Sequence, residues 1–147
     1  MSSTPTAWSV CVARSFIDTN ILVDADDACD PRKQQLALDL LVDLRASQEA
    51  VFSTQVLQDY FVTATRKLGL EAHAARQRVT QFGLFELIQP TLAMMPAGMD
   101  LQQNQSLSFW EALIVQTACA ARCGVLYSED MQAGARIGNV LIVNPFT

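Results

Sequence analysis

Short apolar runs that end in polar residues alternate along this chain with longer stretches of helical periodicity. Two of these runs end at acids: residues 10–17 stop at Asp18, and residues 125–127 are followed by Ser128, Glu129 and Asp130. Short apolar runs with polar ends are typical of buried strands. Further strands are predicted at residues 50–52, 84–88 and 140–143.

Helices are predicted between these strands. Asp30 followed by Pro31 is a typical helix start, because Asp caps free backbone amides and Pro fits the first helical turn. This helix is predicted to run to about residue 46, and Ser53 or Thr54 caps the next one. The remaining helices are predicted at residues 54–67, 71–82 and 108–122, the last one stopped by Gly124.

Residues 91–103 are expected to form a short helix that is interrupted near Pro96 and Gly98. Strands that alternate with helices favour an α/β fold with a mainly parallel central sheet. In such a sheet, ligands bind at the edge formed by the carboxyl ends of the strands.

The composition fits one globular domain. The chain has 147 residues, of which half are hydrophobic and 17% are charged, enough to bury one core. No apolar stretch approaches the roughly 18 residues of a spanning helix, and no basic segment introduces a secretory signal. The four cysteines (Cys11, Cys29, Cys119 and Cys123) lack disulfide or zinc spacing, so we expect buried thiols in a reducing cytoplasm.

Five acids are candidates for a metal site: Asp18, Asp59, Glu111, Glu129 and Asp130. Asp18 and the Glu129-Asp130 pair each follow a predicted strand, so we expect them at the same sheet edge. Carboxylates there would suit Mg²⁺, which prefers oxygen ligands. Such a site could hydrolyse phosphodiesters, because the metal polarises the phosphoryl oxygen and lowers the pKa of a bound water.

Each acid also has a structural explanation. Asp18 could cap a helix or form an Asx turn with Asn20, and Asp59 could face solvent on its helix. Ser108 and Glu111 match a capping box, in which the acid bonds back to the helix start. The Glu129-Asp130 pair could be a solvated turn.

Other chemistries have less support. The single histidine, His73, lies on a polar helix without a nucleophile motif, and no glycine-rich phosphate loop occurs. The net charge of −5 disfavours a broad nucleic-acid surface, so a metal, a basic strip or a partner would have to supply positive charge. Candidate substrate contacts are Asn20, Ser128, Arg66 and Lys67, with Arg76 and Arg78 on the next helix.

Five motifs, in this order, together resemble the PIN-domain ribonucleases, and most of all the VapC-like toxins of bacterial toxin–antitoxin pairs. They are Phe16-Ile-Asp18-Thr-Asn20, Ser53-Thr-Gln-Val-Leu-Gln-Asp59, Leu107-Ser-Phe-Trp-Glu111, Leu126-Tyr-Ser-Glu129-Asp130 and Val143-Asn-Pro-Phe146. The resemblance covers residues 15–147 as a PIN-like nuclease domain. Residues 1–14 form an N-terminal extension or a lead-in to the first strand.

The resemblance implies a three-layer α/β/α fold and Mg²⁺- or Mn²⁺-dependent cleavage of RNA. It implies inhibition by a cognate antitoxin protein and a homodimer. The catalytic acids that it implies are Asp18, Asp59, Glu111 and Asp130, with the metal held by Asp18, Glu111 and Asp130, and by Glu129 as second choice.

Two positions depart from the family pattern. Asp59 stands where the family usually has Glu, and Glu111 where it usually has Asp. Because Mg²⁺ demands near-ideal geometry, the exchanged lengths support an alternative, a catalytically weakened PIN-fold module that binds an antitoxin or RNA. A phosphohydrolase acting on small phosphoesters is a third hypothesis.

Overall fold

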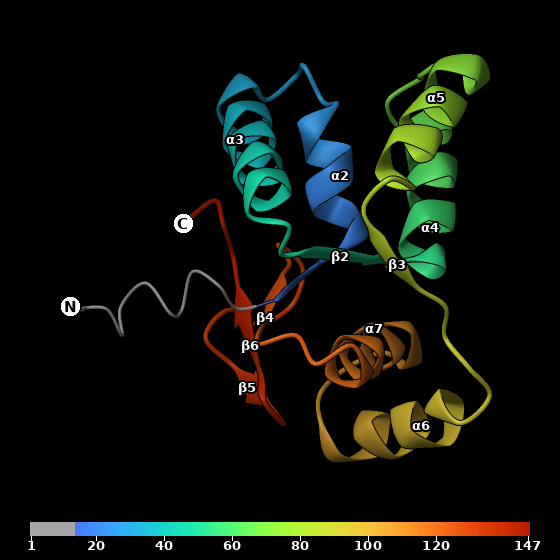
Figure 1. Cartoon of the computed structure of the whole chain (residues 1–147), viewed down its shortest axis with the longest axis vertical. Helices are drawn as coiled ribbons and strands as arrows, with labels where there is room; N and C mark the ends of the chain where they lie inside the picture. The colour runs from blue at the N-terminus through green and yellow to red at the C-terminus, as the bar shows by residue number, and fades with distance from the viewer. Residues whose placement is uncertain (1–13) are drawn as a thin grey trace.

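The computed structural model describes residues 14–147, which form a six-stranded sheet with helices on both faces (Figure 1). The strand order is β3-β2-β1-β4-β6-β5, and every neighbouring pair is parallel except β5 with β6. The strands are β1 (Ser15–Ile17), β2 (Ala50–Ser53), β3 (Glu86–Ile88), β4 (Val125–Tyr127), β5 (Arg136–Ile137) and β6 (Val140–Val143).

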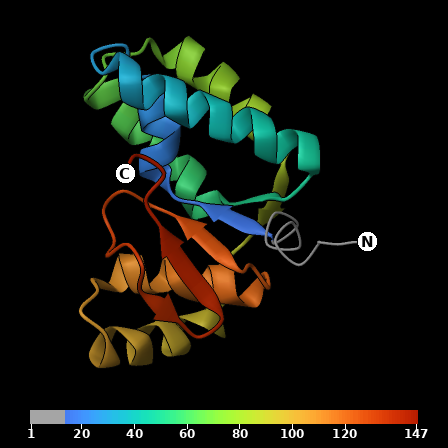
Figure 2. The same ribbon diagram turned by 90° about the vertical axis from the view of Figure 1, so that its left-hand side faces the viewer.

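The helices make two layers. One layer covers one face of the sheet and contains α2 (Thr19–Ala25), α3 (Pro31–Ser47), α4 (Thr54–Arg66) and α5 (Ala72–Phe82). The other layer contains α6 (Met94–Asn104) and α7 (Phe109–Ala120), which pack against each other (Figure 2). The predicted three-layer α/β/α architecture with a mainly parallel sheet is therefore confirmed.

The inner strands are short and mostly buried: β1 and β2 are buried at every residue, and β4 and β6 are buried in part, which explains why they read as apolar runs. Phe16, Phe52 and Leu126, on three adjacent strands, are inaccessible to solvent, and Ile142 on β6 is nearly so. Burying a side chain of this size contributes roughly 1.5–3 kcal/mol. The core therefore fixes the strands whose ends carry the acids.

Most predicted elements are present, and the exceptions have physical reasons. The helix at 91–103 is not interrupted. The helix α6 is continuous because Pro96 is its third residue, and the amide of a third residue has no backbone carbonyl to bond within its own helix. A Cβ at Gly98 would lie 3.6 Å from the Leu113 backbone on α7, an ordinary van der Waals distance, so the packing of α6 on α7 does not depend on this glycine.

Three further details differ from the predictions. The seven-residue α2 and the two-residue β5 were not predicted, since both are too short for periodicity to show. The last long helix ends at Ala120 rather than at residue 122, and Arg122, not Gly124, adopts the left-handed conformation that follows it. Cys123 is buried as expected, but Cys29 is exposed.

Two predictions concern residues that the structure does not describe. The part of the first strand before residue 14 and the nature of the N-terminal extension lie outside the described residues, as does Cys11. Within residues 14–147, none of the helices has both the length and the apolar character needed to cross a bilayer.

Candidate active site

Acids from four elements line one cavity at the carboxyl edge of the sheet. Asp18 follows β1, Asp59 lies on α4, Glu111 lies in the first turn of α7 and Asp130 follows β4. All four line the same cavity of about 470 Å³. The predicted convergence of these residues is therefore present in the fold, although they are more than 100 residues apart at the extremes.

Asp18 caps α2 and also faces the other acids. Its carboxylate accepts hydrogen bonds from the Thr19 amide at 2.7 Å and the Ser128 hydroxyl at 2.9 Å. Burial raises the pKa of Asp18 to about 6, the hydrogen bonds oppose the rise, and the nearby Asp130 and Glu111 carboxylates add to it. The capping explanation and the site explanation therefore both apply to this residue.

Asn20 and Ser128 organise the carboxylates. The Asn20 side-chain amide nitrogen lies 3.3 Å from Asp18 Oδ2 and 3.2 Å from Asp130 Oδ2, so it donates between the two acids. Ser128 is fully buried, and its hydroxyl oxygen lies 3.3 Å from the backbone nitrogens of Asp130 and Met131. Ser128 thus lies beneath the acids and not among the residues that line the cavity.

Glu129 is paired with a lysine and is not among the residues that line the cavity. Its carboxylate forms an ion pair with Lys33 on α3, while its backbone amide donates to Asn20 Oδ1 at 3.0 Å. Asp130 lines the cavity and Glu129 does not. Of the two acids proposed after β4, Asp130 is therefore the one that faces Asp18.

Glu111 combines a structural and a cavity-facing position. Its Oε1 accepts from the Ser108 amide at 3.0 Å, and its own amide donates to the Ser108 hydroxyl at 3.1 Å, which completes the predicted capping box. It also lines the acid cavity. Both uses that the sequence left open are thus present.

The opposite wall of the cavity is formed by α4. Asp59 lies there, and partial burial raises the pKa of its carboxyl. Lys67, one residue past the end of α4, also lines the cavity, whereas Arg66 does not. Arg78 is paired with Asp26 and Arg76 lines a different groove, so neither faces the acids.

Among the residues that line the cavity and were not predicted as site residues, Asp24 and Gln55 carry side-chain oxygens that could bind a cation. Burial and the adjacent Glu129 raise the pKa of Asp24 to about 7, which Lys33 opposes. Asp24 lies four residues after Asn20 on the same face of α2, so recognising that short helix would have revealed it. Gln55 is in the first turn of α4, next to the predicted cap.

The donor set suits a hard divalent cation, but its acids are spread out. The oxygens Asp24 Oδ2 and Gln55 Oε1 are buried with no hydrogen-bond donor among the described residues, and such acceptors are stabilised by an ion or a water. Carboxylate and amide oxygens are what Mg²⁺ binds. Within residues 14–147, however, no three His, Cys, Asp or Glu side chains are close enough to hold a metal ion.

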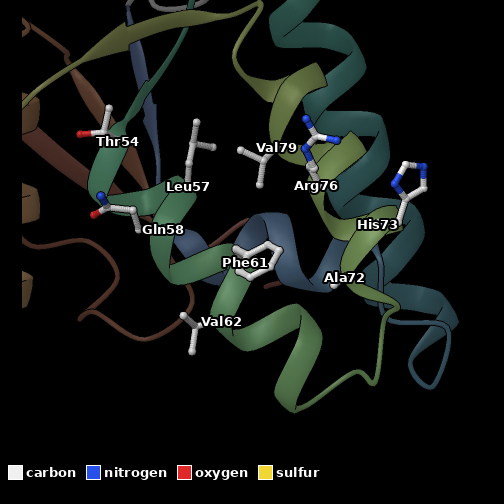
Figure 3. A pocket seen from close by; sticks show the side chains of 9 residues that line it. All are labelled: Thr54, Leu57, Gln58, Phe61, Val62, Ala72, His73, Arg76 and Val79. Carbon is white, nitrogen blue, oxygen red and sulfur yellow. The ribbon is translucent and has the colours of Figure 1, made fainter.

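A second, apolar groove lies between α4 and α5 (Figure 3). Its volume is about 740 Å³, and Leu57, Phe61 and Val79 form its walls. His73 and Arg76 lie at its α5 side. No carboxylate lines this groove, whereas Glu111 and Asp130 also line a further cavity of about 340 Å³.

Solved structures with the same fold are bacterial toxins and toxin–antitoxin complexes. A chain of a toxin–antitoxin complex from Klebsiella pneumoniae superposes with a TM-score of 0.65 at 22% identity, covering 89% of this chain and 97% of that one. VapC20 of Mycobacterium tuberculosis, a toxin that cleaves the sarcin-ricin loop, has a TM-score of 0.62 at 18% identity over 79% and 89%.

A chain of VapBC2 from Rickettsia felis, solved with a DNA fragment of its promoter, has a TM-score of 0.61 at 16% identity over 87% and 96%. This chain has the fold of those proteins. No protein-family model matches the sequence, and no curated protein matches it. At these identities the likeness establishes the PIN-like architecture, and the activity has to be argued from the site.

Proposed function

We propose that this protein is a metal-dependent endoribonuclease that hydrolyses RNA phosphodiester bonds, and that it is the toxin of a type II toxin–antitoxin pair. The observation that carries the proposal is the convergence of Asp18, Asp59, Glu111 and Asp130 on one cavity of about 470 Å³. The fold shared with VapC20, a toxin that cleaves the sarcin-ricin loop, supports it.

Each residue of the cavity has a proposed role that follows from its position. Asp18, Glu111 and Asp130 would hold Mg²⁺ or Mn²⁺, which polarises the phosphoryl oxygen and makes a bound water more acidic. Asp59, on the facing wall, orients or deprotonates the attacking water, and its raised pKa makes it a better base. Lys67 binds a phosphate oxygen of the substrate, and Arg66 contacts the RNA further from the cleaved bond. Asn20 holds the carboxylates of Asp18 and Asp130 in position by its hydrogen bonds to both.

A cognate antitoxin and a second copy of this chain are the proposed protein partners, in the cytoplasm. The complexes from Klebsiella pneumoniae and Rickettsia felis support the antitoxin. The homodimer and the boundary of the nuclease domain at residue 15 rest on the family resemblance of the sequence motifs.

A catalytically weakened binding module is the second candidate. The observation that favours it is that the described acids are not gathered into a ready-made metal site. The exchanged lengths of Asp59 and Glu111 would act in the same direction, because a ligand displaced by one methylene disfavours the strict geometry of Mg²⁺.

Cleavage of defined RNAs by the purified protein separates the candidates. We expect cleavage with Mg²⁺ or Mn²⁺, none with EDTA, and none with Asp18→Asn. Asp43→Asn is the matched control, since it removes the same charge from the exposed face of α3 and should cleave normally. Tight antitoxin binding without cleavage would support the binding module, and turnover of small phosphoesters alone would refute the nuclease.

A further inference from the structure

Trp110 is a large apolar side chain at the rim of the acid cavity. It lies in the first turn of α7, directly before Glu111, and it lines the cavity with that residue. It is 65% exposed, although Trp is highly buried on average. An exposed aromatic next to a polar site requires an explanation that core packing does not supply.

The surroundings hold Trp110 in place. The ring of Phe109 lies 5.3 Å from the Trp110 ring at an interplanar angle of 66°. The capping box of Ser108 and Glu111 fixes the backbone on both sides of Trp110. The indole is therefore presented from a rigid helix start and not from a loop.

The rest of the rim completes a surface with mixed chemistry. On the α4 wall, Val62 is 48% exposed and Lys67 supplies a positive charge. The floor between these walls carries Asp18 and Asp130. An apolar protein segment would bury these carboxylates, which is costly, whereas a nucleotide offers a flat base for the rim and a phosphate that the proposed cation would join to the acids.

We propose that Trp110 is a stacking platform for an unpaired base of RNA, next to the phosphate that is cleaved. This inference rests on the proposed nuclease function and specifies its substrate as single-stranded or looped RNA. Aromatic side chains bind bases in this way with little sequence preference. Paired RNA does not offer its base faces, because they are stacked within the helix.

The test uses the fluorescence of Trp110 itself. The chain has two tryptophans, Trp8 and Trp110, so Trp8→Phe leaves Trp110 as the only one. With Mg²⁺ present and with Asp59→Asn added, which removes the proposed base and keeps the proposed metal ligands, titration with an unpaired RNA octamer should quench this fluorescence. The same octamer annealed to its complement should quench it far less. No quenching by the unpaired octamer would refute the stacking.

A variant series measures the contribution of the ring. Trp110→Ala should weaken binding of the unpaired octamer about 5- to 150-fold, which corresponds to about 1–3 kcal/mol. In cleavage it should raise KM more than it lowers kcat. Trp110→Phe should restore most of the affinity. Leu92→Ala, which truncates a side chain 79% exposed outside the acid cavity, is the control and should change nothing.

The outcomes distinguish this inference from the proposed function. Normal KM and affinity in Trp110→Ala, with cleavage intact, would refute the stacking and leave the nuclease standing. Quenching by unpaired RNA without cleavage under any metal would support the stacking and refute the nuclease. A changed oligomeric mass of Trp110→Ala, with unchanged RNA affinity, would assign the ring to a protein interface and overturn the inference.

Discussion

Replacing Asp18 by Asn should stabilise the metal-free protein while it abolishes cleavage. The pKa of Asp18 is raised from 3.8 to about 6, chiefly by burial. Each pKa unit corresponds to about 1.4 kcal/mol, so ionised Asp18 lowers the free energy of unfolding at pH 7 by about 3 kcal/mol. Asn removes the charge but places an NH₂ group where Asp18 Oδ2 accepts from the Ser128 hydroxyl and the Asn20 amide, and the loss of these two bonds costs about 1 kcal/mol. The net expected gain is about 2 kcal/mol.

The pH dependence follows from the direction of this pKa change. The folded state binds the proton more tightly than the unfolded state, so the stability contributed by the protonated group is complete below about pH 4 and is lost as the pH rises through about 6. The advantage of Asp18→Asn should therefore be full at pH 7.5 and nearly absent at pH 4. Comparison at the same pH cancels the other titrating groups.

Thermal unfolding in EDTA measures this difference. A gain of about 2 kcal/mol should raise the Tm by roughly 5–10 °C at pH 7.5. Asp43→Asn, which makes the same charge change at an exposed position, should shift it little. An Asp18→Asn variant that is less stable than wild type at pH 7.5, or equally changed at both pH values, would refute the conclusion that a charge is held at an energetic cost in this cavity.

Three further predictions test neighbouring residues. Glu111→Gln should abolish cleavage and change the free energy of unfolding by less than about 0.5 kcal/mol, because the amide oxygen of Gln can still accept the hydrogen bond. Ser108→Ala should lower the free energy of unfolding, measured with urea, by about 1 kcal/mol. Equal effects of the two variants on cleavage and on stability would show that the catalytic role of Glu111 is not separate from its capping role. Tyr60→Phe should cost about 2 kcal/mol, because the buried hydroxyl donates to Asp26, and a loss below about 0.5 kcal/mol would contradict this. Lys33→Met should lower kcat roughly tenfold at unchanged KM, because the turn after β4 loses its ion pair, with Lys33→Arg restoring it; unchanged kcat would show that the pair does not position the turn.

The sequence predicts the features of this structure that depend on residues close together along the chain, and it fails for those that depend on distant residues. The strand at 125–127 and the capped helix after Ser108 are found because apolar runs and capping boxes are local patterns. The placement of Asp18 beside Asp130 is predicted because parallel strands end at a common edge. Which acid of the Glu129-Asp130 pair lines the cavity is not predicted, because Glu129 is paired with Lys33, which is distant in sequence.

For two of the acids, the sequence alone leaves open whether they cap a helix or line the site, and in the structure they do both. Asp18 caps α2 and Glu111 closes the capping box of α7, yet both line the cavity. This follows from the fold, since helices begin where strands end, and a helix start favours an acid. A structural explanation of such an acid is therefore no argument against a catalytic one.

The negative net charge of the protein limits which interactions could attract RNA to this cavity. The chain carries a net charge of −5, and Arg14, Lys33 and Arg78 are each paired with an acid. Lys67 is the basic residue among those that line the cavity. Phosphate attraction alone is thus weak, because a protein that neutralises few phosphates gains little from the release of their counterions. The proposed binding of RNA therefore depends on attraction that is independent of charge, such as the proposed stacking on Trp110, together with a cation that offsets the acids.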